Sequence, residues 1–155
     1  MSTRVLVRVL IADDNALIRS GLARLVAAEG DLQVVGTAPD GLRAVELAER
    51  EQPDVVLLDL SMPGLDGVSA AEQIRRKSPS SRVLVLSSHV QEAYVTAAFA
   101  AGVHGYLSKD VSPSDVVEGI RHTHAGGTAV SDRVRSILGA LDQRGQPGGL
   151  RGPSA

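Results

Sequence analysis

Short apolar runs alternate with longer segments of helical periodicity along most of the chain. The short runs are rich in Val, Leu and Ile, which predicts strands buried on both faces. The longer segments place apolar residues three and four positions apart, which predicts amphipathic helices. This alternation predicts an α/β domain with a parallel sheet and helices on both of its faces. The predicted strands are residues 7–12, 32–38, 55–58, 82–87 and 105–108.

Five helices are predicted between and after these strands. In the first, Ile18, Leu22 and Leu25 fall on one stripe. Ser112 or Ser114 can cap the fifth, because a hydroxyl at that position accepts a hydrogen bond from the first turn. The predicted helices are residues 16–28, 42–50, 68–76 and 91–101, and a fifth that ends near residue 123.

The C-terminal residues differ from this alternating region. Residues 131–141 place Val134, Ile137 and Leu138 at helical spacing, which predicts one more amphipathic helix. Residues 142–155 are mostly Gly, Pro and polar residues, which predicts a flexible linker or tail. We therefore expect one domain over residues 1–127, followed by a helix and tail over residues 128–155.

Composition narrows the class of protein. The chain has 155 residues, 43% of them hydrophobic, which suits a single core. Its net charge of −2 comes from interspersed acidic and basic residues, so no basic stripe indicates a nucleic-acid surface within the chain. There is no cysteine, and the N-terminal apolar run is interrupted by Arg4 and Arg8. We expect no signal peptide or membrane span, and a cytoplasmic location.

Polar side chains follow the predicted strands at their carboxyl ends. Asp13 and Asp14 follow the first strand, Asp59 the third, and Lys109 the fifth, while Ser87 ends the fourth. Each residue alone has an ordinary interpretation as a cap, a turn or a solvated charge. However, the carboxyl ends of parallel strands meet at one edge of an open sheet, so these side chains are expected to share one rim.

The residues on this rim complement one another chemically. Three neighbouring carboxylates repel unless a cation lies among them, and oxygen ligands with room for water suit Mg²⁺. Lys109 adds a positive charge that stabilises phosphoryl oxygens, and Ser87 can donate a hydrogen bond to the same group. The sequence therefore predicts that the carboxylate of Asp59 accepts a phosphoryl group beside Mg²⁺.

Four motifs in order resemble the receiver domain of two-component response regulators. They are IADDN (11–15), LLDLSMPGLDG (57–67), VLVLSSH (83–89) and AGVHGYLSKD (101–110), and the resemblance covers about residues 8–127. It is nearest to the branch of nitrate and nodulation regulators with a LuxR-type output domain. The resemblance implies a flavodoxin-like (CheY-like) doubly wound fold, with a five-stranded parallel sheet of strand order 2-1-3-4-5 and five flanking helices.

The resemblance also implies a role for individual residues. Asp59 would accept the phosphoryl group from a phosphohistidine of a sensor histidine kinase. Asp14 would bind Mg²⁺ directly and Asp13 through water, with Asp59 and the carbonyl of Ser61 as the other protein ligands. The chain would catalyse only its own phosphorylation and dephosphorylation, so it is expected to be a signalling domain and not an enzyme of metabolism.

A switch is implied at the same rim. Ser87 and Lys109 would move toward the phosphoryl group, and Tyr106 would turn inward into the space that Ser87 leaves. Asp110 follows the lysine where many receivers have proline. A homodimer is a further expectation from the resemblance, through the fourth or fifth helix or through the first and fifth.

Two other classes of protein remain as alternatives. A haloacid-dehalogenase-type phosphatase needs a second Asp two residues after the nucleophile, and Ser61 occupies that position. A phosphate-independent pseudo-receiver would lack the acidic pair, the acceptor or the lysine, all of which are present. The output is open: either a DNA-binding helix-turn-helix domain of a longer regulator outside this chain, or protein contacts of a stand-alone receiver.

Overall fold

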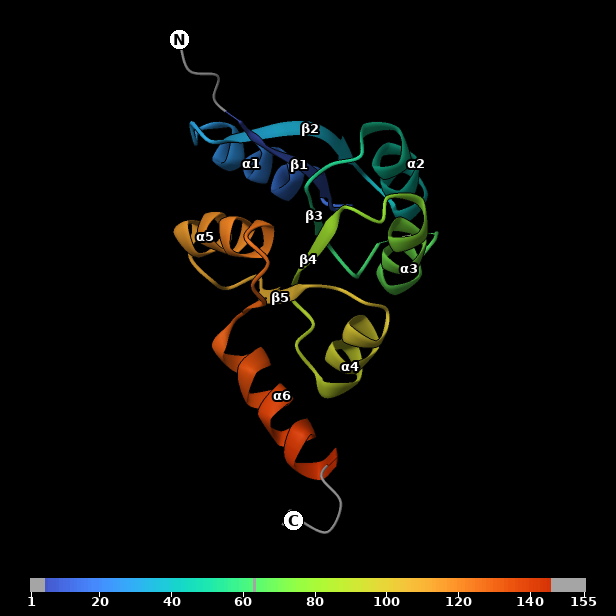
Figure 1. Cartoon of the computed structure of the whole chain (residues 1–155), viewed down its shortest axis with the longest axis vertical. Coiled ribbons are helices and arrows are strands. Elements are labelled where there is room, and N and C mark those ends of the chain that lie inside the picture. Colours follow the sequence, from blue (N-terminus) through green and yellow to red (C-terminus); the bar gives the residue numbers. More distant parts are fainter. Residues whose placement is uncertain (1–4, 63, 146–155) are drawn as a thin grey trace.

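The computed structural model of the chain describes residues 5–62 and 64–145. In this part the strands form a single parallel sheet with the order β2-β1-β3-β4-β5-β6, and helices flank both faces (Figure 1). This is the flavodoxin-like doubly wound arrangement. The elements are β1 (Val7–Ala12), α1 (Ala16–Ala27), β2 (Leu32–Ala38), α2 (Gly41–Glu51), β3 (Val55–Leu58), α3 (Gly67–Lys77), β4 (Arg82–Ser87), α4 (Glu92–Ala100), β5 (Gly105–Ser108), α5 (Pro113–His124), β6 (Ala129–Val130) and α6 (Asp132–Gly145).

The predicted fold class and the order of the first five strands are confirmed. The sheet has one more strand than the five predicted, because β6 pairs in parallel with β5 and extends that edge. Two residues are too few to form a periodic pattern, so this strand could not be predicted. The flanking helices likewise number six in the described residues, α6 being the C-terminal helix predicted separately.

Two hydrophobic layers lie on opposite faces of the sheet. Successive residues of a strand point to opposite sides, so Val9 and Ile11 pack with α1 and α5, whereas Leu10 and Ala12 pack with α2, α3 and α4. Figure 1 shows α1 and α5 on one side of the sheet and α2, α3 and α4 on the other. All four residues of β3 are buried, so this strand is fixed from both faces.

The apolar stripe of the first helix, α1, is only partly buried. Val26 is fully buried, but Leu22 and Leu25 are only partly buried and Ile18 is 37% exposed. These three stripe residues line a groove of about 620 Å³ between α1 and α5. The stripe therefore faces the neighbouring helix α5 as well as the sheet.

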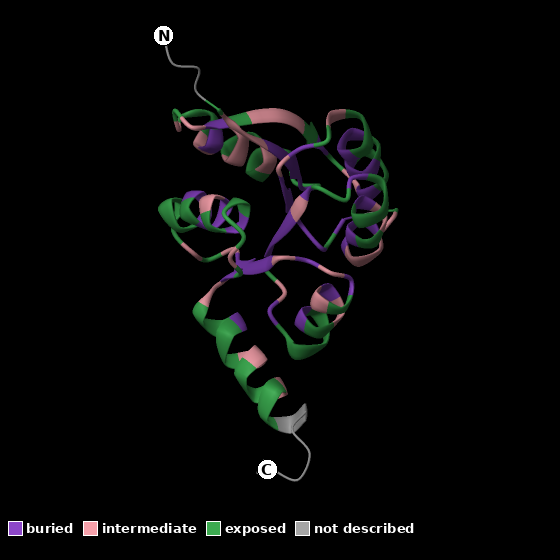
Figure 2. Ribbon diagram, viewed as in Figure 1, coloured by how far each residue is buried: buried purple, intermediate pink, exposed green. Residues whose placement is uncertain are grey.

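The C-terminal helix continues beyond its predicted end. It extends to Gly145, so residues 142–145 are helical, which contradicts the prediction that the linker begins at residue 142. Val134 is buried in the core, while Ile137 and Leu138 are partly buried against it. Figure 2 shows that most of α6 is otherwise exposed. The remainder of the predicted tail, residues 146–155, lies outside the described residues.

Among the described residues, no helix is both long enough and apolar enough to cross a membrane.

Candidate functional site

The sheet brings the predicted site residues to its carboxyl edge. The N–H of Asp59 donates to the carbonyl of Ala12 over 2.9 Å, which places the acidic ends of β1 and β3 side by side. The N–H of Lys109 donates to the carbonyl of Ser87 over 3.0 Å, which aligns the ends of β4 and β5. Asp59 and Lys109 are thus each held by a backbone hydrogen bond to the neighbouring strand.

Two buried carboxylates share the ammonium group of Lys109. Its Nζ lies 2.9 Å from Oδ2 of Asp13 and 3.4 Å from Oδ2 of Asp59. Asp13 and Asp59 are 1% and 3% exposed, so few waters can screen this interaction. Buried charges in proteins are normally paired or bound to a metal ion, and here Lys109 supplies the pairing.

A third carboxylate completes a set of oxygen donors. Asp14 is exposed, and one oxygen each from Asp13, Asp14 and Asp59 lie within 4.8 Å of one another. Hard oxygen donors with one side open to water suit Mg²⁺, which keeps several of its own water ligands. The residues present therefore fit this ion, with Ser61 beside Asp59 to offer a backbone carbonyl.

Backbone hydrogen bonds orient the two buried carboxylates. The N–H of Asn15 donates to Oδ1 of Asp13 over 2.9 Å, and the N–H of Ser61 donates to Oδ1 of Asp59 over 3.1 Å. Arg19, one turn into α1, donates to the carbonyl of Asp13 over 2.8 Å. Arg19 was not predicted from the sequence, although its place one turn after an acidic pair was a usable signal.

The loop after Asp59 turns tightly into α3. The N–H of Gly67 donates to the carbonyl of Leu60 over 3.2 Å. A Cβ atom at Gly67 would lie 2.4 Å from Cα of Leu60 and 2.8 Å from the carbonyl oxygen of Asp59, so only glycine fits here. Asp66 caps α3 by accepting the N–H of Ser69. Within the predicted loop motif, Pro63 lies outside the described residues.

The pKa values of Asp59 and Lys109 are both raised, but for different reasons. Burial raises the pKa of the Asp59 carboxyl, while the hydrogen bond from Ser61 and the charge of Lys109 oppose this and Asp13 adds to it. Burial by itself lowers the pKa of Lys109, but the hydrogen bond to Asp13 and the charges of both carboxylates outweigh it, so its pKa is raised. The lysine is therefore a permanent cation, and Asp59 is a carboxylate of raised basicity.

The hydroxyl groups of Ser87 and Tyr106 both form hydrogen bonds with the backbone of His89. Ser87 is fully buried, and its Oγ accepts the N–H of His89 over 3.0 Å. Tyr106 is also fully buried, and its hydroxyl donates to the carbonyl of His89. Burial raises the pKa of this hydroxyl. The ring of His89 stacks on Tyr94 of α4, with centroids 4.9 Å apart, a contact that the sequence did not reveal.

The ring of Tyr106 therefore occupies the inward position that the resemblance assigned to the switched form. Its movement stays a prediction. Asp110 follows Lys109 through a trans bond, since the described residues contain no cis peptide bond.

Comparison with known proteins gives a consistent family. A family model described as the response regulator receiver domain matches residues 9–121. The nitrate/nitrite response regulator protein NarL of Escherichia coli (strain K12) is 36% identical over 140 residues, which is 90% of this chain and 65% of that protein. The chain thus spans slightly less than two thirds of this relative.

Two solved structures share both fold and sequence. The crystal structure of a LuxR-family two-component response regulator from Aurantimonas sp. SI85-9A1 has a TM-score of 0.83 and 31% identity, over 88% of this chain and 98% of that one. The signal receiver domain of the putative response regulator NarL from Mycobacterium tuberculosis has a TM-score of 0.76 and 38% identity, over 79% and 98% of the two chains.

Proposed function

The chain belongs to the response regulator receiver domain family, and from this premise we propose that Asp59 accepts a phosphoryl group from a phosphohistidine of a sensor histidine kinase. A carboxylate oxygen of Asp59 attacks the phosphorus and forms a P–O bond. The P–N bond to the donor imidazole breaks, and that nitrogen keeps the electron pair. The observation that carries the proposal is the pairing of two buried carboxylates with one ammonium group at the carboxyl edge of the sheet.

Asp13, Asp14, Asp59 and the carbonyl of Ser61 would hold Mg²⁺ in this proposal. The ion supplies positive charge that lowers the repulsion between the carboxylates and an incoming phosphoryl group. The chain itself contributes the rigid strand end that fixes Asp59 and the hydrogen bond from Ser61 that engages Oδ1, so that Oδ2 is the oxygen that faces Lys109.

Lys109 and Ser87 would stabilise the phosphorylated carboxylate. A side-chain phosphoryl group carries roughly −1.5 to −2 charge at neutral pH, so the ammonium of Lys109 gains a stronger partner there. Ser87 can donate its hydroxyl hydrogen while its oxygen still accepts from His89. Because Tyr106 shares His89 as a partner, we propose that this pair transmits the change to β5 and α4.

The output proposed for this switch is control of transcription. The chain would act through a LuxR-type helix-turn-helix domain that binds DNA in a longer protein, since NarL is named as a response regulator and the Aurantimonas structure as LuxR family. The alternatives are a stand-alone receiver that acts through protein contacts and a phosphate-independent binding module. We also propose a cytoplasmic location. We further propose a homodimer, and sedimentation with and without phosphorylation would test this oligomeric state.

The phosphoacceptor role is tested by incubating the chain with acetyl phosphate and Mg²⁺ and measuring its intact mass. One phosphoryl adduct is expected on the wild type, and none on the Asp59→Asn variant or after chelation of Mg²⁺. If a phosphorylated kinase also leaves the wild type unmodified, the phosphate-independent module becomes the better account.

A further inference from the structure

We infer that Ser131 is a positioning residue for Lys109 and couples α6 to the phosphoacceptor site, an inference that rests on the proposed function of that site. Ser131 lies between β6 and α6, ten residues beyond the part of the chain that the receiver family model matches. Residues 128–155 were predicted to lie outside the domain. Ser131 connects them to β5, the strand that directly precedes Lys109.

Two hydrogen bonds connect Ser131 to β5. Its N–H donates to the carbonyl of Tyr106 over 3.2 Å, which continues the parallel pairing of Tyr106 with Val130. Its Oγ accepts the N–H of Ser108 over 3.1 Å. Ser131 therefore binds β5 at the switch tyrosine and again at the residue that precedes Lys109.

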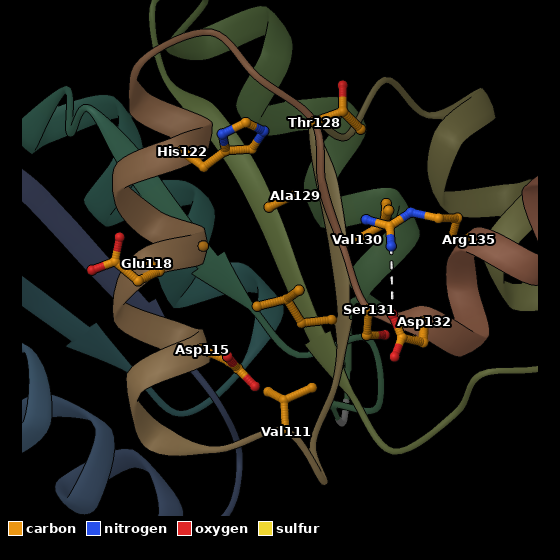
Figure 3. Close-up of a pocket in the computed structure, with 12 residues that line it drawn as sticks. Val111, Asp115, Glu118, His122, Thr128, Ala129, Val130, Ser131, Asp132 and Arg135 are labelled. Atoms are coloured by element: carbon orange, nitrogen blue, oxygen red, sulfur yellow. Dashed lines mark hydrogen bonds and ion pairs between the residues drawn. The ribbon is translucent and has the colours of Figure 1, made fainter.

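The hydroxyl of Ser131 replaces a backbone carbonyl in the sheet. In a parallel pair, the next bond after Tyr106 would run from the N–H of Ser108 to the carbonyl of Ser131. That carbonyl instead accepts the N–H of Arg135 over 2.9 Å in the first turn of α6. The side chain takes over the bond to Ser108, although a serine before a helix commonly caps the helix itself. Figure 3 shows Ser131 at this junction, beside Asp132 and below Val130.

The N–H of Ser108 depends on this one acceptor. Ser108 is 5% exposed, so water cannot readily take the place of the Ser131 hydroxyl. A buried N–H without an acceptor is unfavourable, so the chain would shift to satisfy it. The end of β5 would then lose the bond from Ser108 on the β6 side and keep the bond from Lys109 to Ser87 on the other side.

Such a shift acts directly on Lys109, the next residue. Its ammonium lies 2.9 Å from Asp13 and 3.4 Å from Asp59. The rate of phosphoryl transfer is sensitive to a displacement of about 1 Å in such a group. The same joint begins α6, whose Val134 is buried in the cluster that contains Tyr106. Movement of Lys109 on phosphorylation would therefore reach α6 through Ser131.

The test compares Ser131→Ala with Ser131→Thr, which keeps the hydroxyl, and with Ser136→Ala, the same change at an exposed position of α6. Phosphorylation by acetyl phosphate at saturating Mg²⁺ is followed by intact mass at a temperature where all variants are folded. We expect about a tenfold lower rate for Ser131→Ala, a rate near wild type for Ser131→Thr, and no change for Ser136→Ala. Saturating Mg²⁺ ensures that a changed affinity for the ion, which shares Asp13 with Lys109, does not alter the measured rate.

A second readout needs no phosphoryl transfer. Hydrogen exchange of the Ser108 and Lys109 amides and of the first turn of α6 should be faster in Ser131→Ala and unchanged in Ser136→Ala. If Ser131→Ala keeps both the wild-type rate and the wild-type exchange, the inference about Ser131 is refuted while the proposed function stands. A wild-type chain that takes no phosphoryl group from any donor would instead refute the proposed function, and with it the role of Ser131 in that reaction.

Discussion

Lys109 lies closer to Asp13 than to Asp59, with Nζ–Oδ2 distances of 2.9 and 3.4 Å. The lysine is therefore held chiefly by the carboxylate that accepts no phosphoryl group in our proposal. This leaves its ammonium able to follow Asp59 when the charge there increases. It also means that a cation bound by the carboxylates must share Asp13 with Lys109.

Removal of the lysine charge should destabilise the chain and strengthen Mg²⁺ binding. Lys109→Met leaves two buried carboxylates without their cation, which should lower the free energy of unfolding by about 2 kcal/mol without Mg²⁺. Because Mg²⁺ then meets more negative charge, it should raise the melting temperature of this variant more than that of wild type. Thermal unfolding over a Mg²⁺ titration measures both effects.

The matched control for that experiment is Lys77→Met. Lys77 is exposed, and its nearest carboxylate, on Glu49, is 3.9 Å away. It should unfold as wild type does at every Mg²⁺ concentration. Equal responses of the two variants to Mg²⁺ would show that Lys109 does not compete with the ion.

The charge on Asp59 should cost stability at neutral pH. Its pKa in the folded chain is raised above the ordinary 3.8, so the folded state binds the proton more tightly and loses stability as the pH rises above 3.8 through the folded pKa. Asp59→Asn removes this loss and should be more stable by about 1 kcal/mol at pH 7 without Mg²⁺. Denaturant unfolding of both chains should show the difference shrink toward pH 3.8; a difference independent of pH would contradict it.

His104 should make the fold sensitive to mild acid. Its Nδ1 accepts the N–H of Val83 over 2.9 Å, and burial, with the charges of Arg82 and Arg75, lowers its pKa below 6.5. The unfolded chain thus binds more protons just below pH 6.5, and stability should fall as the pH drops through that value.

Two histidine variants isolate this effect. His104→Asn keeps an acceptor for Val83 without a titrating ring, so its melting temperature should lose this dependence between pH 7 and 5. His124→Asn, at an exposed position, should keep it. A profile for His104→Asn that parallels wild type would assign the acid sensitivity to other groups.

Glycine at position 67 should be required for the loop that holds Asp59. Gly67→Ala forces a Cβ into the backbone of Leu60 and Asp59, and it should lower the free energy of unfolding by about 3 kcal/mol. Gly21→Ala, in open space on α1, should instead raise it by about 0.5 to 1 kcal/mol. Denaturant unfolding measures both changes; a stable Gly67→Ala with normal phosphorylation would show that the loop adapts.

The strands were predictable because the central ones are buried on both faces. Runs such as residues 55–58 are apolar throughout, because both faces of the strand are buried. The polar residues of the rim stand at the carboxyl ends of such runs. The rim residues were predictable for a related reason, since the topology of a parallel sheet collects strand ends. Contacts that depend on long-range packing, such as the stack of His89 on Tyr94, leave no such pattern.

The C-terminal segment shows why the remainder escaped prediction. Residues 129–130 form a strand because they pair with the edge of β5. The hydroxyl of Ser131 accepts the N–H of Ser108 because the carbonyl of Ser131 already accepts the N–H of Arg135 in α6. The helix was predicted from Val134, Ile137 and Leu138, but its end was not, because polar residues at 142–145 can continue a helix that packing has already fixed.

The most direct measurement identifies the residue that carries the phosphoryl group. The chain is phosphorylated with acetyl phosphate and Mg²⁺, reduced with borohydride, which converts an aspartyl phosphate to homoserine, and mapped by peptide mass spectrometry. We expect homoserine at position 59 alone, and none when Mg²⁺ is chelated. Homoserine at Asp13 or Asp14, or at no position while an intact-mass adduct is present, would contradict the assignment of Asp59 as the phosphoacceptor.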